Sequence, residues 1–221
     1  MSLPIPPQPL VWINGWPEAG KRTLAQCLVH LLGQDRAVLA GENEYATEYA
    51  ASGQSNKSVG RKSSKPDLGS ESDPVSEKQA AYFRKYVEDP QALKRIVVFT
   101  DFQADSVKGR SRARAFEEAA RRTGRPFVPV YMECDLEANV RRSQASERRH
   151  SRPAVKMLSE TELRELRKPG VQLYKFSFDE HPGVCVDVTS RETHNTAMRI
   201  MVSVREAAEN RQHAAARAVG G

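Results

Sequence analysis

The sequence has no hydrophobic run that approaches the roughly 20 residues of a membrane-spanning helix. Its first residues, MSLPIPPQPL, also lack the basic region and the long apolar stretch of a secretory signal. We therefore expect a protein that is neither embedded in a membrane nor secreted, and we place it in the cytoplasm.

Cysteine and histidine are also scarce. The three cysteines, Cys27, Cys134 and Cys185, are far apart and odd in number, so they predict neither a disulfide framework nor a metal site. We expect buried free thiols in a reducing compartment. The five histidines form no HxxxH or HExxH pattern, so we expect no bound zinc.

Positive charge exceeds negative charge, with a formal net charge of +6 and a pI near 9.3. This balance admits nucleic acid as a partner but does not require it, because a domain that binds triphosphates also gathers arginines. The chain has no interleaving of aromatic and basic residues such as an RNA-recognition motif carries. Nucleic acid is therefore the weakest of the three functions considered below.

Strand-like and helix-like segments alternate along the chain. Strands are expected at 10–14, 36–40, 95–100, 126–134 and 183–189, and helices at 21–32, 76–89, 111–124, from 135 onward, at 159–170 and at 193–216. Ser76 is expected to cap the helix at 76–89, and Ser159 and Glu162 are expected to form a capping box at the start of the helix at 159–170. This order predicts one α/β domain over residues 1–221, with a doubly wound, parallel, five-stranded sheet. Residues 51–74 have almost no large apolar side chains, which indicates a disordered insertion.

The most informative stretch is VWINGWPEAGKRTLAQCL, residues 11–28. Its residues 15–21 fit the GxxxxGK pattern of a phosphate-binding loop, the Walker A motif, and they lie between a strand and a helix as that motif requires. The glycines let backbone N–H groups turn toward phosphate oxygens, and the lysine reaches the terminal phosphates.

Two residues depart from that pattern. Arg22 occupies the position of the serine or threonine whose hydroxyl joins the Mg²⁺ shell, so either Thr23 or water must supply that ligand. Glu18 places a carboxylate in the loop, where it would repel phosphates unless it points outward. Both features favour weaker or metal-poor nucleotide binding over none.

With INGWPEAGKRTLA the chain resembles the P-loop small-molecule kinases related to adenylate, gluconate and chloramphenicol kinases. It is most similar to the fungal and bacterial kinase-like P-loop NTPases that carry an AAA designation, whose loop reads INGWPGxGKxTxA. Glu18 stands where those loops have glycine. The resemblance implies a three-layer P-loop NTPase fold of the kinase type with an arginine-rich lid, which we expect at 141–158.

The resemblance also implies a set of site residues. Lys21, Asp101, Arg148 and Arg149 would be catalytic, and Thr23 and Asp101 would hold Mg²⁺. The nucleotide would be bound by Gly15, Trp16, Pro17, Glu18, Ala19, Gly20, Lys21, Arg22, Thr23 and Arg142. Each has a plainer alternative: Asp101 could cap the next helix, the arginines could form a solvated helix face, and Trp16 could pack on the core.

These observations predict an ATP-dependent phosphotransferase that uses Mg²⁺ and acts on a small-molecule acceptor, as a monomer or a homodimer. The alternative is a diverged nucleotide-binding protein, an ATPase or a non-catalytic one. It is favoured by Glu18, by Arg22 and by residues 41–75, which do not match the acceptor segment of the similar kinases and offer Glu42 and Glu44 as the nearest acids.

Overall fold

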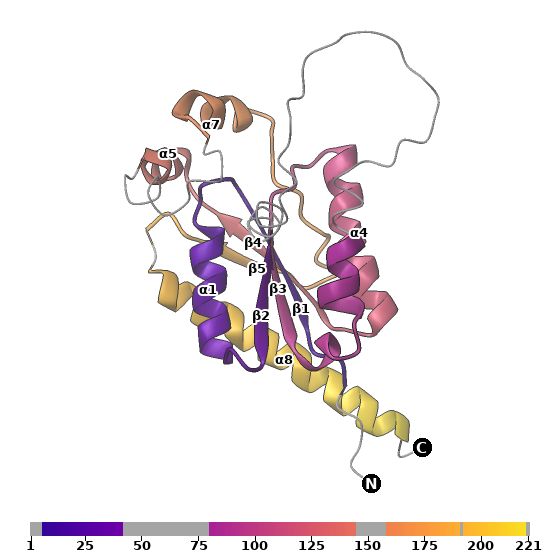
Figure 1. The fold of residues 1–221 in the computed structure, drawn as a ribbon. Helices are drawn as coiled ribbons and strands as arrows, with labels where there is room; N and C mark the ends of the chain where they lie inside the picture. The colour runs from indigo at the N-terminus through magenta and orange to yellow at the C-terminus, as the bar shows by residue number, and fades with distance from the viewer. Residues whose placement is uncertain (1–5, 42–79, 145–157, 191, 220–221) are drawn as a thin grey trace, which may run out of the picture.

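The computed structural model describes residues 6–41, 80–144, 158–190 and 192–219. Five parallel strands form one sheet in the order β2-β3-β1-β4-β5, as Figure 1 shows. The strands are β1 (Leu10–Gly15), β2 (Ala37–Gly41), β3 (Ile96–Asp101), β4 (Phe127–Glu133) and β5 (Val184–Asp187). This confirms the predicted doubly wound parallel sheet.

Helices cover both faces of the sheet, which makes three layers (Figure 1). On one face α1 (Lys21–Leu32) packs against α8 (Thr193–Val219), and on the other α4 (Val107–Thr123) packs against the π-helical turn η1 (Phe83–Glu88). The remaining described elements are a 3-10 turn η2 (Ala92–Lys94) and the helices α5 (Leu136–Gln144) and α7 (Glu160–Leu166).

Strand β1 lies at the centre of the sheet, where it pairs with β3 on one side and with β4 on the other. Every one of its residues is therefore buried. Its side chains alternate between the faces: Val11 and Ile13 enter the core under α1 and α8, whereas Leu10 and Trp12 enter the aromatic core under α4. The sheet order reverses at β1, since β3 lies on one side and β4 on the other. The carboxyl end of such a strand is where α/β sheets bind ligands.

Two helices differ from the sequence expectation. Helix α4 begins at Val107 and not at 111, because the Ser106 side chain caps it by accepting a hydrogen bond from the N–H of Gly109 at 3.1 Å. The helix expected at 76–89 is described only from residue 80, and its last part, η1, has the wider π geometry. The guanidinium of Arg125 donates to the carbonyls of Tyr86 and Val87 at the end of that turn.

The start of α7 matches its expectation. The capping box of Ser159 and Glu162 is present at the start of α7. No helix in the described part of the chain is both long and apolar enough to cross a membrane. The insertion expected at 51–74 and the cap expected at Ser76 lie outside the described residues.

The expectation of buried thiols is only partly right. All three cysteines are free, and Cys134 is buried, but Cys27 is half-buried and Cys185 is exposed. Cys185 belongs to β5, the edge strand of the sheet, where only Val186 has a buried side chain. An apolar sequence pattern does not reveal that a strand lies at the edge, where one face can remain open to solvent.

Candidate nucleotide site

The loop between β1 and α1 contains two residues with a left-handed backbone. Gly20 has φ 98° and Glu18 has φ 60°, both in the left-handed region. A Cβ added to Gly15 would lie 3.0 Å from the Cβ of Met132 and 3.3 Å from the Cδ of Lys21, so glycine is needed there for the lysine to pass. At Glu18 the conformation explains why related loops carry glycine, because a side chain disfavours positive φ.

Lys21 folds back over this loop. Its Nζ donates hydrogen bonds to the carbonyl oxygens of Gly15 and Trp16, both at 2.8 Å. The ammonium therefore lies beside the glycines at the amino end of α1, where the helix dipole favours an anion. The loop and its lysine thus lie between a strand and a helix, as the sequence motif requires.

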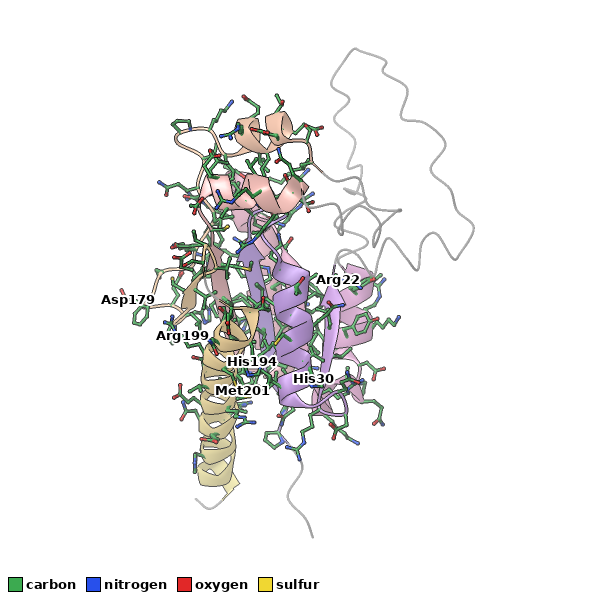
Figure 2. The ribbon with its side chains drawn as sticks, turned by 90° about the vertical axis from the view of Figure 1, so that its left-hand side faces the viewer. Arg22, His30, Asp179, His194, Arg199 and Met201 are labelled. Carbon is green, nitrogen blue, oxygen red and sulfur yellow. The ribbon has the colours of Figure 1, made fainter. Side chains whose placement is uncertain are left out.

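The next two residues occupy the first turn of α1. The Arg22 side chain is half-buried and the Thr23 side chain is exposed. Figure 2 shows Arg22 at the end of α1 that follows the loop, with His30 near the other end. Only Thr23 of this pair has an oxygen that can ligate a cation.

Asp101, at the carboxyl end of β3, is held in a network of donors. Its Oδ2 accepts from the indole N–H of Trp12 at 3.2 Å, and its Oδ1 accepts from the backbone N–H of Phe102 at 2.8 Å. The Gln103 amide donates to both oxygens at 3.0 Å. Asp101 does not cap α4, since Ser106 does.

A buried asparagine that no sequence pattern marked holds the segment after Asp101 in place. Asn14, on β1 and paired with Asp101 in the sheet, donates to the carbonyls of Gln103 at 3.0 Å and Tyr174 at 2.9 Å. Its Oδ1 accepts from the N–H of Gln103 at 2.8 Å. Every polar atom of this side chain is bonded, so β1, the end of β3 and the segment before β5 are held together.

Arg142, on α5, donates a hydrogen bond to the loop. It donates to the carbonyl of Ala19 at 3.3 Å, to the Sγ of Cys134 at 3.1 Å, and to the carbonyls of Val188 and Thr189 after β5. Burial raises the pKa of the Cys134 thiol, which therefore stays protonated. Arg148, Arg149 and most of the expected lid, 141–158, lie outside the described residues.

Two further residues at the loop were missed by the sequence analysis. Asn139 on α5 is fully buried and donates to the carbonyl of Pro17 at 2.9 Å. Arg167, just after α7, lies over the ring of Trp16 at 4.8 Å, and burial lowers the pKa of its guanidinium. Trp16 is itself buried, and its ring centroid lies 5.6 Å from that of Phe102. It therefore packs on the core, as the plainer alternative has it.

The donors at the loop suit a polyphosphate: backbone N–H groups, a helix amino end and an ammonium. For Mg²⁺, the described residues contain no group of three histidine, cysteine or acidic side chains that could enclose an ion. Mg²⁺ bound to a nucleotide keeps several waters and phosphate oxygens as ligands, so one or two protein oxygens suffice. Thr23 and Asp101 remain the candidates.

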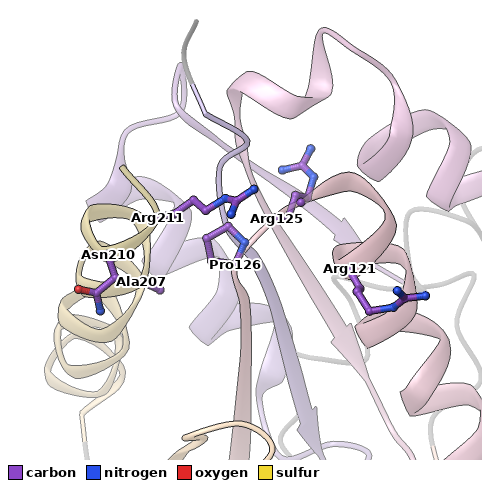
Figure 3. A pocket seen from close by; sticks show the side chains of 7 residues that line it. Arg121, Arg125, Pro126, Ala207, Asn210 and Arg211 are labelled. Carbon is purple, nitrogen blue, oxygen red and sulfur yellow. The ribbon is translucent and has the colours of Figure 1, made fainter. Parts of the chain in front are cut away.

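A hollow of about 470 Å³ lies at the opposite end of the sheet, before β4 (Figure 3). Three arginines line it, Arg121, Arg125 and Arg211. Arg121 pairs with Glu118 at 2.8 Å within α4, and Arg125 donates to backbone carbonyls including those of Gln8 and Ala92. Because Arg125 is a structural residue at the base of the fold and the hollow has no sequence motif, the phosphate loop is the better candidate site.

No protein-family profile matches the sequence, and no curated protein matches it either. Solved structures do match. A Chloroflexus aurantiacus protein provisionally named a kinase has 15% identity and a TM-score of 0.57, with 92% of this chain and 100% of that chain covered. Kti12 from Chaetomium thermophilum, solved with ADP-AlF3, has 16% identity and a TM-score of 0.53, with 90% and 98% covered.

The APS kinase CysC of Mycobacterium tuberculosis, solved with AMPPNP and APS, has 14% identity and a TM-score of 0.51, with 91% of this chain and 99% of that chain covered. At such identities the likeness establishes the fold. The chain therefore has the fold of the P-loop small-molecule kinases.

Proposed function

We propose that this protein binds ATP with Mg²⁺ at the loop of residues 15–21 and transfers the terminal phosphoryl group to a small-molecule acceptor. The observation that carries the proposal is the position of Lys21 at the amino end of α1. Its ammonium donates hydrogen bonds to the carbonyls of Gly15 and Trp16 in the loop. Three free cysteines favour a reducing compartment such as the cytoplasm.

In this reaction an oxygen of the acceptor attacks the γ-phosphorus, and the bond from that phosphorus to the β–γ bridging oxygen breaks. ADP leaves, and the acceptor proton passes to a carboxylate or to water. Little covalent chemistry is asked of the protein, so its contribution is to position the groups and to neutralise charge.

Each site residue has a role in that scheme. Lys21 neutralises the β- and γ-phosphates, and Arg148 and Arg149 are the proposed phosphate-binding arginines of the lid. Thr23 offers a hydroxyl to Mg²⁺. Asp101 holds Mg²⁺ through water or receives the acceptor proton.

A second candidate is a protein that binds the nucleotide without transferring phosphate. The hydrogen bonds that Asp101 accepts from Trp12, Phe102 and Gln103 favour it, because they occupy both oxygens of the carboxylate that the kinase would use for Mg²⁺ or for the acceptor proton. Arg22 also favours this second candidate, because it occupies the position of the serine or threonine whose hydroxyl joins the Mg²⁺ shell.

One experiment in two stages separates these functions. Thermal melting of the whole chain with ATP, GTP and ADP, each with and without Mg²⁺, is expected to show stabilisation by ATP. ADP release is then measured with alcohols, antibiotics and nucleosides as acceptors. Release that requires an acceptor supports the kinase, stabilisation without any release supports the second candidate, and no stabilisation by any nucleotide contradicts both.

A further inference from the structure

The phosphate loop contains one residue whose backbone conformation is disfavoured, and α5 donates hydrogen bonds to the carbonyls of the residues before and after it. Glu18 has φ 60°, which costs free energy for any residue with a side chain. The carbonyl of Pro17, just before it, accepts a hydrogen bond from Asn139 at 2.9 Å. The carbonyl of Ala19, just after it, accepts one from Arg142 at 3.3 Å.

These two bonds set the direction of the loop's N–H groups. In a trans peptide the C=O and the following N–H point in opposite directions. Because the carbonyls of Pro17 and Ala19 point toward α5, the N–H groups of Glu18 and Gly20 point away from it. Nearby N–H groups directed to one side are what an anion-binding concavity needs.

The two donors are themselves fixed. Asn139 is fully buried, and its Oδ1 accepts a hydrogen bond from Arg167 at 2.8 Å. Arg167 also donates to the carbonyl of Cys134 at 2.7 Å and lies over the ring of Trp16, a residue of the loop. The hydrogen bonds of Arg142 to Cys134 and Val188 tie it to the ends of β4 and β5.

We propose that Asn139, Arg142 and Arg167 form a clamp that holds Glu18 in its left-handed conformation and so keeps the loop in its phosphate-binding shape. They are positioning residues, which act on the nucleotide through the loop backbone. The clamp stabilises the left-handed backbone at position 18, which a glycine at that position would adopt without strain. This proposal rests on nucleotide binding at the loop, as proposed above.

The clamp predicts a specific coupling between positions 18 and 139. Asn139→Ala removes the bond to Pro17 and is expected to weaken ATP binding about tenfold, the loss of roughly one good hydrogen bond. Glu18→Gly makes the left-handed conformation free of strain. The double variant Glu18→Gly/Asn139→Ala is therefore expected to bind ATP within about threefold of Glu18→Gly alone.

The control is Arg164→Ala. Arg164 joins α5 to α7 by pairing with Glu137 at 2.7 Å, and it also pairs with Glu160 at 2.8 Å; both partners lie outside the loop of residues 15–21. Its loss is expected to leave ATP affinity unchanged. If buried Asn139 does not tolerate alanine, Arg142→Lys with and without Glu18→Gly repeats the cycle at the other bond.

Calorimetric titration with Mg²⁺-ATP measures these affinities. Rescue by Glu18→Gly supports the clamp. An Asn139→Ala variant that binds like the wild type, or a double variant as weak as Asn139→Ala, overturns it. If the wild type binds no ATP, the proposed function fails, and amide hydrogen exchange of residues 15–20 then tests the clamp on its own. Faster exchange in Asn139→Ala than in Arg164→Ala supports the clamp, and equal exchange rates in the two variants overturn it.

Discussion

The indole N–H of Trp12 donates a hydrogen bond to the carboxylate of Asp101 at 3.2 Å, across the pairing of β1 with β3. Trp12 is completely buried in the aromatic core under α4. The acidic residue at the candidate site is thus also a structural residue, and the two roles can be separated by measurement.

Asp101→Asn is expected to lower the free energy of unfolding by about 1–3 kcal/mol without any ligand. An amide has one accepting oxygen, so it cannot accept from Trp12 at one position and from the backbone N–H of Phe102 at the other, as the two carboxylate oxygens do. Urea unfolding followed by tryptophan fluorescence measures the change. Asp105→Asn, which loses an exposed pair with Arg110, is the control and should cost roughly 1 kcal/mol or less. Equal losses in the two variants would contradict the structural role of Asp101.

Tyr131 on β4 makes stability depend on alkaline pH. Burial raises its pKa to about 12, while its oxygen accepts the N–H of Phe176 at 2.8 Å. An unfolded tyrosine loses its proton near pH 10, so between about pH 10 and 12 the folded state binds more protons. The free energy of unfolding should therefore fall as the pH rises through this range.

Tyr131→Phe is expected to reduce that slope by up to about 1.4 kcal/mol per pH unit. Urea titrations at several pH values from 9 to 11.5 measure it. Tyr86→Phe, which changes a half-buried tyrosine on η1, serves as the matched control. The pKa assignment is wrong if both variants keep the wild-type slope.

The order of effects at Arg22 and Thr23 tests how the metal is held. If the Thr23 hydroxyl joins the Mg²⁺ shell, Thr23→Ala should weaken Mg²⁺-ATP binding more than Arg22→Ala does. Thr23→Ala should also weaken binding of metal-free ATP less than it weakens binding of Mg²⁺-ATP. Calorimetric titration with ATP in the presence of Mg²⁺, and again in the presence of EDTA, measures the two affinities separately. Equal and small effects at both positions would show that Thr23 is not a ligand.

Much of the architecture could be predicted from the sequence. The strand at 10–14 and the helix at 21–32 have apolar patterns that depend only on neighbouring residues, and the structure places β1 and α1 there. The capping box at Ser159 is local as well. Such features are readable because the residues that determine them lie within a few positions of one another.

The contacts that shape the loop could not be predicted in this way. Asn139 and Pro17 lie far apart in the sequence, and no local pattern marks them as partners. The same holds for Asn14 with Tyr174. Glu18 did carry a signal, because glycine in similar loops indicates a left-handed backbone that a glutamate must also adopt.

The most direct test of the account is ATP binding by Lys21→Ala. The ammonium makes a charge-assisted contact with the β- and γ-phosphates that contributes roughly 1.5–3 kcal/mol, about ten- to a hundredfold in affinity. Phosphoryl transfer should fall further than binding, since charge grows on the bridging oxygen in the transition state.

Calorimetric titration with Mg²⁺-ATP tests this on the wild type, on Lys21→Ala and on the control Lys168→Ala. Lys168 is an exposed lysine that pairs with Glu165. The account predicts that only Lys21→Ala loses affinity by that amount, while its unfolding transition without ligand stays close to that of the wild type. If the wild type and Lys21→Ala bind ATP equally, or if neither binds it, the loop is only a turn between a strand and a helix.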